Sequence, residues 1–299
     1  YRKVNDTDIY YFPQILPEKG GFPEIEIEGK PTIYATGDAR YPLGEGADIG
    51  ISVQTPEAGL LERLGLSAPP EVQSPESTRW FYEAALACVR EEDPDLLYCT
   101  TNDFVFHHHG PGTPEAAEQI RWMNEYVRRI HEADPERRIY ITADHGMNQK
   151  HRLINFQAMA DRRGLRLYCL PPLKDRYIEN HIYQEGGILY VFLENESQRE
   201  GFLALAQSTP EVERVLACSQ AAAEFHLPAD RIGDYVMLAA ADCAFGEVEG
   251  ERLVTDAVRT HGSLYEQEIP LWAIHPEESE EKYEYSKDVA AIAMRRKGK

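Results

Sequence analysis

The sequence lacks the features of a disulfide-stabilised, exported or membrane-spanning protein. Its 299 residues contain five cysteines, an odd number without any C-x-x-C pair, so we expect reduced thiols and not a disulfide framework. No apolar run approaches the roughly 20 residues that span a bilayer, and no signal-peptide pattern opens the chain. We therefore expect a cytoplasmic protein that has no membrane as a partner.

Basic residues are also scarce. The chain has 31 Lys and Arg against 51 Asp and Glu, a formal net charge of -20. Such a field repels nucleic-acid phosphates and anionic membranes, so we expect no nucleic-acid partner. It equally disfavours an anionic small molecule, so a phosphate-type ligand needs a local cationic centre, for which bound metal is the natural candidate.

Internal repeats, low-complexity tracts and Ser/Gly linkers are absent, and the remaining pattern is typical of an α/β protein. Short apolar runs alternate with segments of helical period, which predicts βα units and a mainly parallel sheet. We expect strands at 48–53, 95–100, 138–142, 165–170, 188–193 and 235–240.

Two long helices are predicted at 76–91 and 115–133, each with apolar residues near one face. We expect Thr113 to cap the second helix, with Pro114 in its first turn. Turn signals on either side predict that residues 152–234 form a smaller cap lobe inserted into a core of residues 1–151 and 235–299.

Residues 100–112 have the sequence T-T-N-D-F-V-F-H-H-H-G-P-G and directly follow the strand expected at 95–100. Catalytic groups of open α/β sheets gather at the carboxyl ends of strands. If Asp103 and His107 are one helical turn apart, their carboxylate and imidazole converge, which suits a metal ion with oxygen and nitrogen ligands. The alternative is a histidine-rich loop without function.

Two further segments place a histidine directly before a glycine. Asp144 and His145 end an apolar strand, and Gly146 lets the backbone turn while both side chains point at a ligand. His261 and Gly262 precede another apolar run. Taken singly, each histidine is as well explained by an ordinary surface or hydrogen-bonded role, and only their combination indicates a metal site.

The order D-x-x-x-H, T-A-D-H-G-M and R-x-H-G-x-x-x-E-Q-x-x-P resembles the phosphonoacetate hydrolase branch of the alkaline phosphatase superfamily. Similar text at 109–116 and 227–234 extends the resemblance, which runs from about residue 30 to residue 271. It implies an alkaline-phosphatase-like core with a parallel sheet between helices. It also implies two zinc ions close together at the strand ends.

The resemblance assigns the metal ligands residue by residue. It implies that Asp103, His107 and His261 bind one zinc ion and that Asp144 and His145 bind the other. Two such ions clamp the attacking and leaving oxygens of a displacement at phosphorus. The implied reaction is hydrolysis of a phosphonate C–P bond, which converts a phosphonoacetate-like substrate to a carboxylate and phosphate.

Two parts of the family pattern are not found. The family has a further aspartate ligand and a threonine nucleophile upstream, so we expect that its N-terminal quarter is missing here or that the chain is a degenerate homologue. Thr32, in a Pro-Thr context, is the one candidate nucleophile. Gly37 and Ala39 stand where the family has lysines for the substrate carboxylate, and Arg40 is the candidate substitute.

The same motifs leave other functions open. One is a phosphodiesterase or phosphomonoesterase of the same superfamily, and another is a catalytically silent homologue that binds metal and a phosphorylated ligand. The histidine-rich ligand set favours zinc, although manganese and iron accept the same ligands. The expected partner is a small phosphonate or phosphate ester, and a homo-oligomer is one alternative for the oligomeric state.

Overall fold

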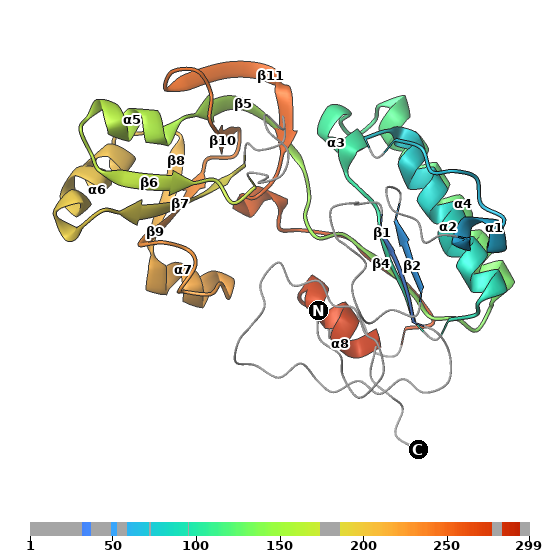
Figure 1. Cartoon of the computed structure of the whole chain (residues 1–299). Coiled ribbons are helices and arrows are strands. Elements are labelled where there is room, and N and C mark those ends of the chain that lie inside the picture. Colours follow the sequence, from blue (N-terminus) through green and yellow to red (C-terminus); the bar gives the residue numbers. More distant parts are fainter. Residues whose placement is uncertain are drawn as a thin grey trace. The chain divides into compact units, whose positions relative to one another are not determined.

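The computed structural model describes residues 32–36, 49–52, 59–71, 73–94, 96–173, 186–276 and 283–293. The chain forms two compact units (Figure 1). Unit 1 contains residues 1–105, 111–142 and 271–299, and unit 2 contains residues 106–110 and 143–270. Helix α3 (Phe104–His108) crosses from one unit into the other.

Unit 1 contains a three-stranded parallel sheet and a two-stranded antiparallel ribbon. The sheet has the order β2-β1-β3, and the ribbon pairs β12 with β4. The strands are β1 (Thr32–Thr36), β2 (Ile49–Ser52), β3 (Leu96–Thr100), β4 (Ile139–Thr142) and β12 (Leu271–Ile274). Parallel strands need a crossover, and helices lie in the connection from β2 to β3.

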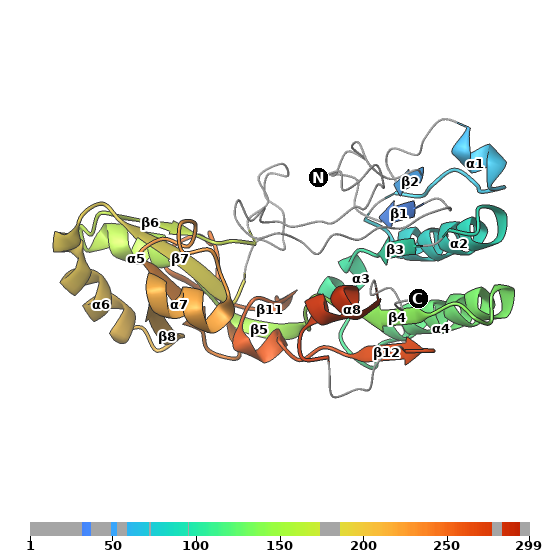
Figure 2. The same cartoon turned by 90° about the horizontal axis from the view of Figure 1, so that it is seen from below.

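The helices of unit 1 are α1 (Leu60–Arg63), α2 (Pro75–Glu91), α4 (Pro114–Ala133) and α8 (Ser286–Ala293). Figures 1 and 2 show α2 and α4 side by side against the strands. The stacked rings of Tyr82 and Tyr126, with centroids 6.0 Å apart, join the two helices. The predicted cap of α4 is confirmed, because Thr113 Oγ1 accepts a hydrogen bond from Ala116 N.

Unit 2 contains an antiparallel sheet of order β6-β7-β9-β8. Its strands are β6 (Leu167–Leu170), β7 (Ile188–Leu193), β8 (Val212–Ala217) and β9 (Tyr235–Ala239). The helices are α5 (Phe156–Arg162), α6 (Arg199–Gln207) and α7 (Cys218–Phe225), with a short 3-10 turn η1 (Glu196–Gln198) before α6.

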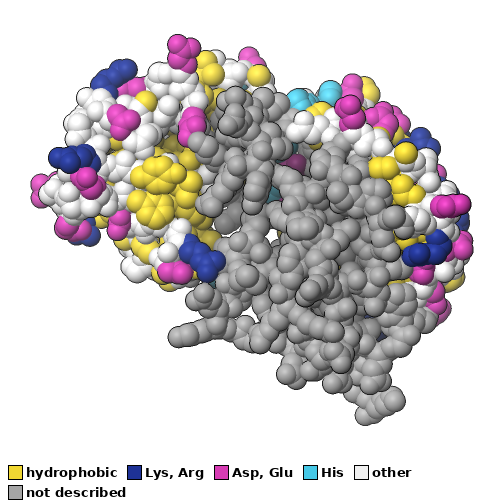
Figure 3. Space-filling view, viewed as in Figure 1, with side chains coloured by type: hydrophobic (Ala, Val, Ile, Leu, Met, Phe, Trp, Pro, Cys, Tyr) yellow, Lys and Arg dark blue, Asp and Glu magenta, His cyan; other side chains and the backbone are white. Residues whose placement is uncertain are grey.

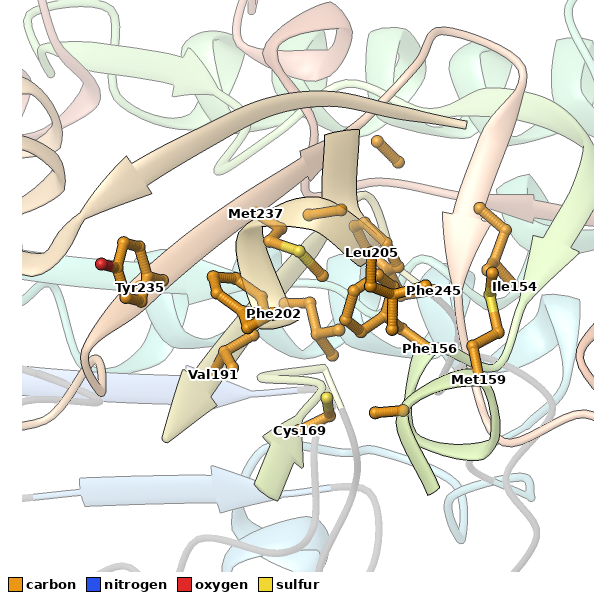
Figure 4. Close-up of a cluster of buried hydrophobic side chains, with 14 of the residues drawn as sticks. Ile154, Phe156, Met159, Cys169, Val191, Phe202, Leu205, Tyr235, Met237 and Phe245 are labelled. Carbon is orange, nitrogen blue, oxygen red and sulfur yellow. The ribbon is translucent and has the colours of Figure 1, made fainter. Parts of the chain in front are cut away.

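Two apolar cores enclose strand β9, all of whose residues are buried. Met237 and its neighbours on one face pack with Phe156 and Phe202 in the cluster of Figure 4. Val236 and Leu238 on the other face pack in a second cluster. Side chains of a strand alternate between faces, so burial on both faces gives an unbroken apolar run.

A second sheet of unit 2 has the order β10-β5-β11. Its strands are β5 (Asn148–Ile154), β10 (Cys243–Phe245) and β11 (Arg252–Thr260). β5 and β11 are antiparallel, with Asn148 opposite Thr260. The start of β5 therefore lies beside the end of β11, which is followed by the 3-10 turn η2 (Leu264–Glu266).

The prediction of a mainly parallel sheet is wrong for the described strands. All six predicted strands are present with ends shifted by two residues at most, but three strand pairings are parallel and five are antiparallel. The wrong expectation has a physical reason, which β9 illustrates. This strand is apolar throughout because side chains pack on both of its faces, and that burial does not depend on whether its neighbours are parallel or antiparallel. The predicted cap lobe at 152–234 stays a prediction.

The surface agrees with the charge balance of the sequence. Figure 3 shows acidic side chains over the visible described surface, with Lys and Arg between them. Many charged side chains of the described helices form exposed ion pairs, such as Arg128 with Glu132 on α4. Among the described helices, none is long and apolar enough to cross a membrane.

Candidate metal centre

The segment that carries Asp103 and His107 folds as a short helix. α3 (Phe104–His108) begins directly after Asp103, and Asn102 Oδ1 accepts a hydrogen bond from the backbone N–H of Phe104 at 3.3 Å. Asp103 therefore directly precedes the helical turn that contains His107, which is close to the arrangement on which their predicted convergence depends. Residues four apart along a helix lie on one face.

His107 is buried, and one hydrogen bond defines its tautomer. Its Nδ1 lies 2.7 Å from the carbonyl oxygen of Arg259, which can only accept, so Nδ1 carries the proton. The ring then has its lone pair on Nε2, the arrangement usual for a histidine that binds metal. Arg259 adds a second link, because its Nε donates to the carbonyl oxygen of Phe106 at 2.9 Å.

Asp144 and His145 lie in the turn that leads from β4 to β5. Nδ1 of His145 lies 2.9 Å from the carbonyl oxygen of Gly146, so the same argument puts the lone pair of His145 on Nε2. Asp144 Oδ1 lies 3.5 Å from that Nε2 and accepts from the backbone N–H of His145 at 3.1 Å. The side chain of Asp144 is 89% exposed, so an ion bound there remains open to solvent.

His261 follows directly on β11 and reaches His145 because β11 and β5 are antiparallel. The two rings are stacked, with centroids 3.4 Å apart and an interplanar angle of 9°. The ring of His107 also adjoins that of His261, with centroids 5.8 Å apart. Gly262 has φ +97°, a left-handed conformation that glycine adopts without strain, and this turns the chain sharply after His261.

Asp103, His145 and His261 form a group that could hold a metal ion. Each offers one ligand atom, and the three ligand atoms lie within 4.8 Å of one another. All three residues are partly buried. One carboxylate and two imidazoles form a donor set that zinc accepts in catalytic sites with three protein ligands, so these residues fit the expected metal.

A buried ion pair lies behind the histidines. Lys150 Nζ donates to Glu266 Oε1 at 2.8 Å, and the two side chains are 0% and 1% exposed. Burial acts to raise the pKa of Glu266, but hydrogen bonds from Lys150, Ser263 and Asn148 outweigh it, and the pKa is lowered. Glu266 is therefore a carboxylate at neutral pH.

Comparison with known proteins identifies the family. Residues 64–264, more than half of the chain, match the type I phosphodiesterase / nucleotide pyrophosphatase family. The chain belongs to this family. Its placement in the alkaline phosphatase superfamily, inferred from the three motifs, is confirmed.

Solved structures similar to this phosphodiesterase-family chain support the same fold. Phosphonoacetate hydrolase from Sinorhizobium meliloti 1021 in complex with phosphonoformate has a TM-score of 0.74 at 25% identity, over 89% of this chain and 70% of that chain. Its complex with phosphonoacetate has a TM-score of 0.73 with the same identity and coverage. Murine ectonucleotide pyrophosphatase / phosphodiesterase 5 shares the fold, with a TM-score of 0.53 at 15% identity over 81% of this chain and 60% of that chain.

The structure does not describe the side chains of two further residues singled out in the sequence. Thr32 begins β1, and its role as a nucleophile stays a prediction. Arg40, together with Gly37 and Ala39, lies outside the described residues.

Three residues that support the histidines could not be assigned a role from the sequence. Glu266 stands in the E-Q part of the third motif, so the motif contained a signal without a role attached. Arg259 is the arginine that opens the same motif, again without a role attached. Lys150 gave no such signal, since a lysine normally faces solvent.

Proposed function

We propose that this family member is a zinc-dependent hydrolase of a small phosphonate, converting a phosphonoacetate-like substrate and water to a carboxylate and phosphate. The observation that carries the proposal is the grouping of Asp103, His145 and His261, whose ligand atoms lie within 4.8 Å of one another. The substrate class is suggested by the Sinorhizobium meliloti phosphonoacetate hydrolase, which was crystallised with phosphonoacetate and with phosphonoformate.

We assign Asp103, His107, Asp144, His145 and His261 to a two-zinc centre. The family resemblance divides them between two ions, whereas the group with ligand atoms within 4.8 Å takes His145 from one set and Asp103 and His261 from the other. Paired metal ions in such enzymes are about 3.5–4 Å apart, so ligands of neighbouring ions are expected to intermingle. The grouping is compatible with the two-ion assignment.

The chain's own residues prepare the site for this chemistry. Bound zinc polarises a phosphoryl oxygen and lowers the pKa of water. The backbone carbonyls of Arg259 and Gly146 hold His107 and His145 in the tautomer that presents Nε2. A cationic centre is also what an anionic phosphonate needs on a chain with a net charge of -20.

The second candidate is hydrolysis of a phosphodiester. The observation in its favour is the family match itself, which spans residues 64–264 and is described by phosphodiesterase and nucleotide pyrophosphatase activity. Both reactions are displacements at phosphorus and use the same metal ligands, so the substrate decides between them.

Phosphate release from phosphonoacetate separates the two candidates. We expect zinc-dependent release by the native protein, with little turnover of bis(4-nitrophenyl) phosphate or 4-nitrophenyl phosphate. His226→Asn is the matched control, because His226 ends α7 at φ 55°, a conformation that asparagine tolerates, and it should keep full activity. Faster turnover of the diester would favour the second candidate, and no zinc-dependent turnover of any of the three would contradict both.

A further inference from the structure

Glu266 joins the two turns that carry the metal-binding histidines. Its backbone carbonyl accepts a hydrogen bond from Gly146 N at 2.7 Å, directly after His145. Its carboxylate Oε2 accepts from the backbone N–H of Ser263 at 2.9 Å and from the Ser263 hydroxyl at 2.5 Å, two residues after His261. One residue therefore holds both turns, one through its backbone and the other through its side chain.

The other carboxylate oxygen is anchored on β5. Glu266 Oε1 accepts from Lys150 Nζ and from Asn148 Nδ2, each at 2.8 Å. Lys150 Nζ also donates to the carbonyl oxygen of Ala241 at 2.9 Å. Buried ion pairs add little stability beyond what apolar residues of similar size provide, so a hydrogen-bonded pair at this place is better explained by the geometry that it fixes.

The turn after His261 has little room to move. Gly187 N donates to the carbonyl oxygen of His261 at 2.9 Å, and a Cβ on Gly187 would lie 2.4 Å from Ser263 Cβ. The backbone of Gly187 thus packs tightly against this turn, which the carboxylate of Glu266 also holds through Ser263. A displacement caused by a change at Glu266 is therefore expected to move His261, because the tightly packed turn cannot adjust on its own.

We propose that Glu266, with Lys150 as its counter-ion, is a positioning residue of the metal centre. It sets the placement of the His145 ring against the His261 ring and thereby determines the metal affinity of the site. Its carboxylate acts through hydrogen bonds behind the histidines and does not bind the ion. The inference rests on the proposed metal centre.

The test compares the zinc affinity of the native protein with that of Glu266→Gln, measured by competition with a chelator. Glutamine keeps the size of the side chain but replaces an acceptor oxygen by a donor NH₂ group facing Ser263 or Lys150. Loss of such a support behind metal ligands typically weakens metal binding by about 10–100-fold, and we expect a loss in that range. The visible absorption spectrum of the Co²⁺-loaded protein should change as well, because it reports ligand geometry.

Glu211→Gln is the matched control. Glu211 is also a mostly buried glutamate of unit 2, with a side chain 8% exposed, and it accepts from Arg252 Nε at 2.9 Å. Replacing this carboxylate by an amide should lower stability without altering zinc affinity or the Co²⁺ spectrum. If Glu266→Gln does not fold, Ser263→Ala removes one hydrogen bond to the same carboxylate, and we expect a several-fold loss of affinity from it.

The outcomes are distinguishable. One outcome is that the native protein binds zinc tightly and that folded Glu266→Gln, or Ser263→Ala in its place, binds it equally well. This outcome would overturn the positioning role and leave the proposed function intact. An equal loss of affinity in Glu211→Gln would also overturn it, because the effect would then follow stability alone. Absence of zinc binding by the native protein would overturn both proposals.

Discussion

His261→Ala is expected to lower phosphonate hydrolysis by about 10³-fold or more. Metal ions supply several kcal/mol of transition-state stabilisation, and each 1.36 kcal/mol corresponds to a factor of ten. His261 is the ring that adjoins both other site histidines, His145 at 3.4 Å and His107 at 5.8 Å between centroids, so its removal affects the whole ligand set. The measurement is kcat/KM for zinc-dependent phosphate release, with His226→Asn as the control.

The same variant should lose the stabilisation that metal gives the native protein. An ion that binds only the folded state adds about 2.7 kcal/mol at a free concentration of 100 times Kd. We expect zinc to raise the melting temperature of the native protein and a chelator to reverse this, with His261→Ala insensitive to both. A melting temperature of His261→Ala that still rises with zinc as in the native protein would contradict its role as a ligand.

Lys150→Met is expected to lower the free energy of unfolding by about 3–5 kcal/mol, because it leaves the buried carboxylate of Glu266 without its counter-ion. Chemical denaturation at pH 7 measures this loss. The double variant Lys150→Met with Glu266→Gln removes the uncompensated charge. Its loss of unfolding free energy should therefore be smaller than the sum of the losses in the two single variants. Strictly additive losses would show that the two side chains do not interact.

The effect of Lys150→Met should also depend on pH. The folded-state pKa of Glu266 is lowered below the ordinary glutamate value of about 4.3, so the stabilisation by the ionised pair is present above that value. It is lost as the pH falls through the lowered pKa of the folded state. The stability difference between native protein and Lys150→Met should therefore narrow as the pH is lowered from 7 through about 4, and a difference that stays constant over this range would contradict the ion pair as its cause.

Local structure could be predicted from the sequence because it depends on neighbouring residues. The helix from Pro114 begins with a threonine cap and a proline in its first turn, both of which act within one turn. The short helix Phe104–His108, on which the predicted convergence of Asp103 and His107 depends, is likewise local. The strand at Ile188–Leu193 is an uninterrupted apolar run with the predicted ends.

Long-range pairing could not be predicted in the same way. An apolar run such as β9 does not state the direction of its neighbours, so the antiparallel sheet of unit 2 was missed. The pairing of Lys150 with Glu266, 116 residues further along, depends on the antiparallel register of β5 and β11. Single histidines likewise gave no evidence of proximity until the motif order supplied it.

Anomalous X-ray diffraction at the zinc absorption edge, from crystals of the zinc-loaded protein, tests the metal centre most directly. We expect an anomalous peak about 2.0–2.2 Å from a carboxylate oxygen of Asp103 and from imidazole nitrogens of His145 or His261, with a second peak about 3.5–4 Å away. A peak at other residues would contradict the proposed metal centre. So would the absence of any peak while the rings of His145 and His261 still stack directly on each other.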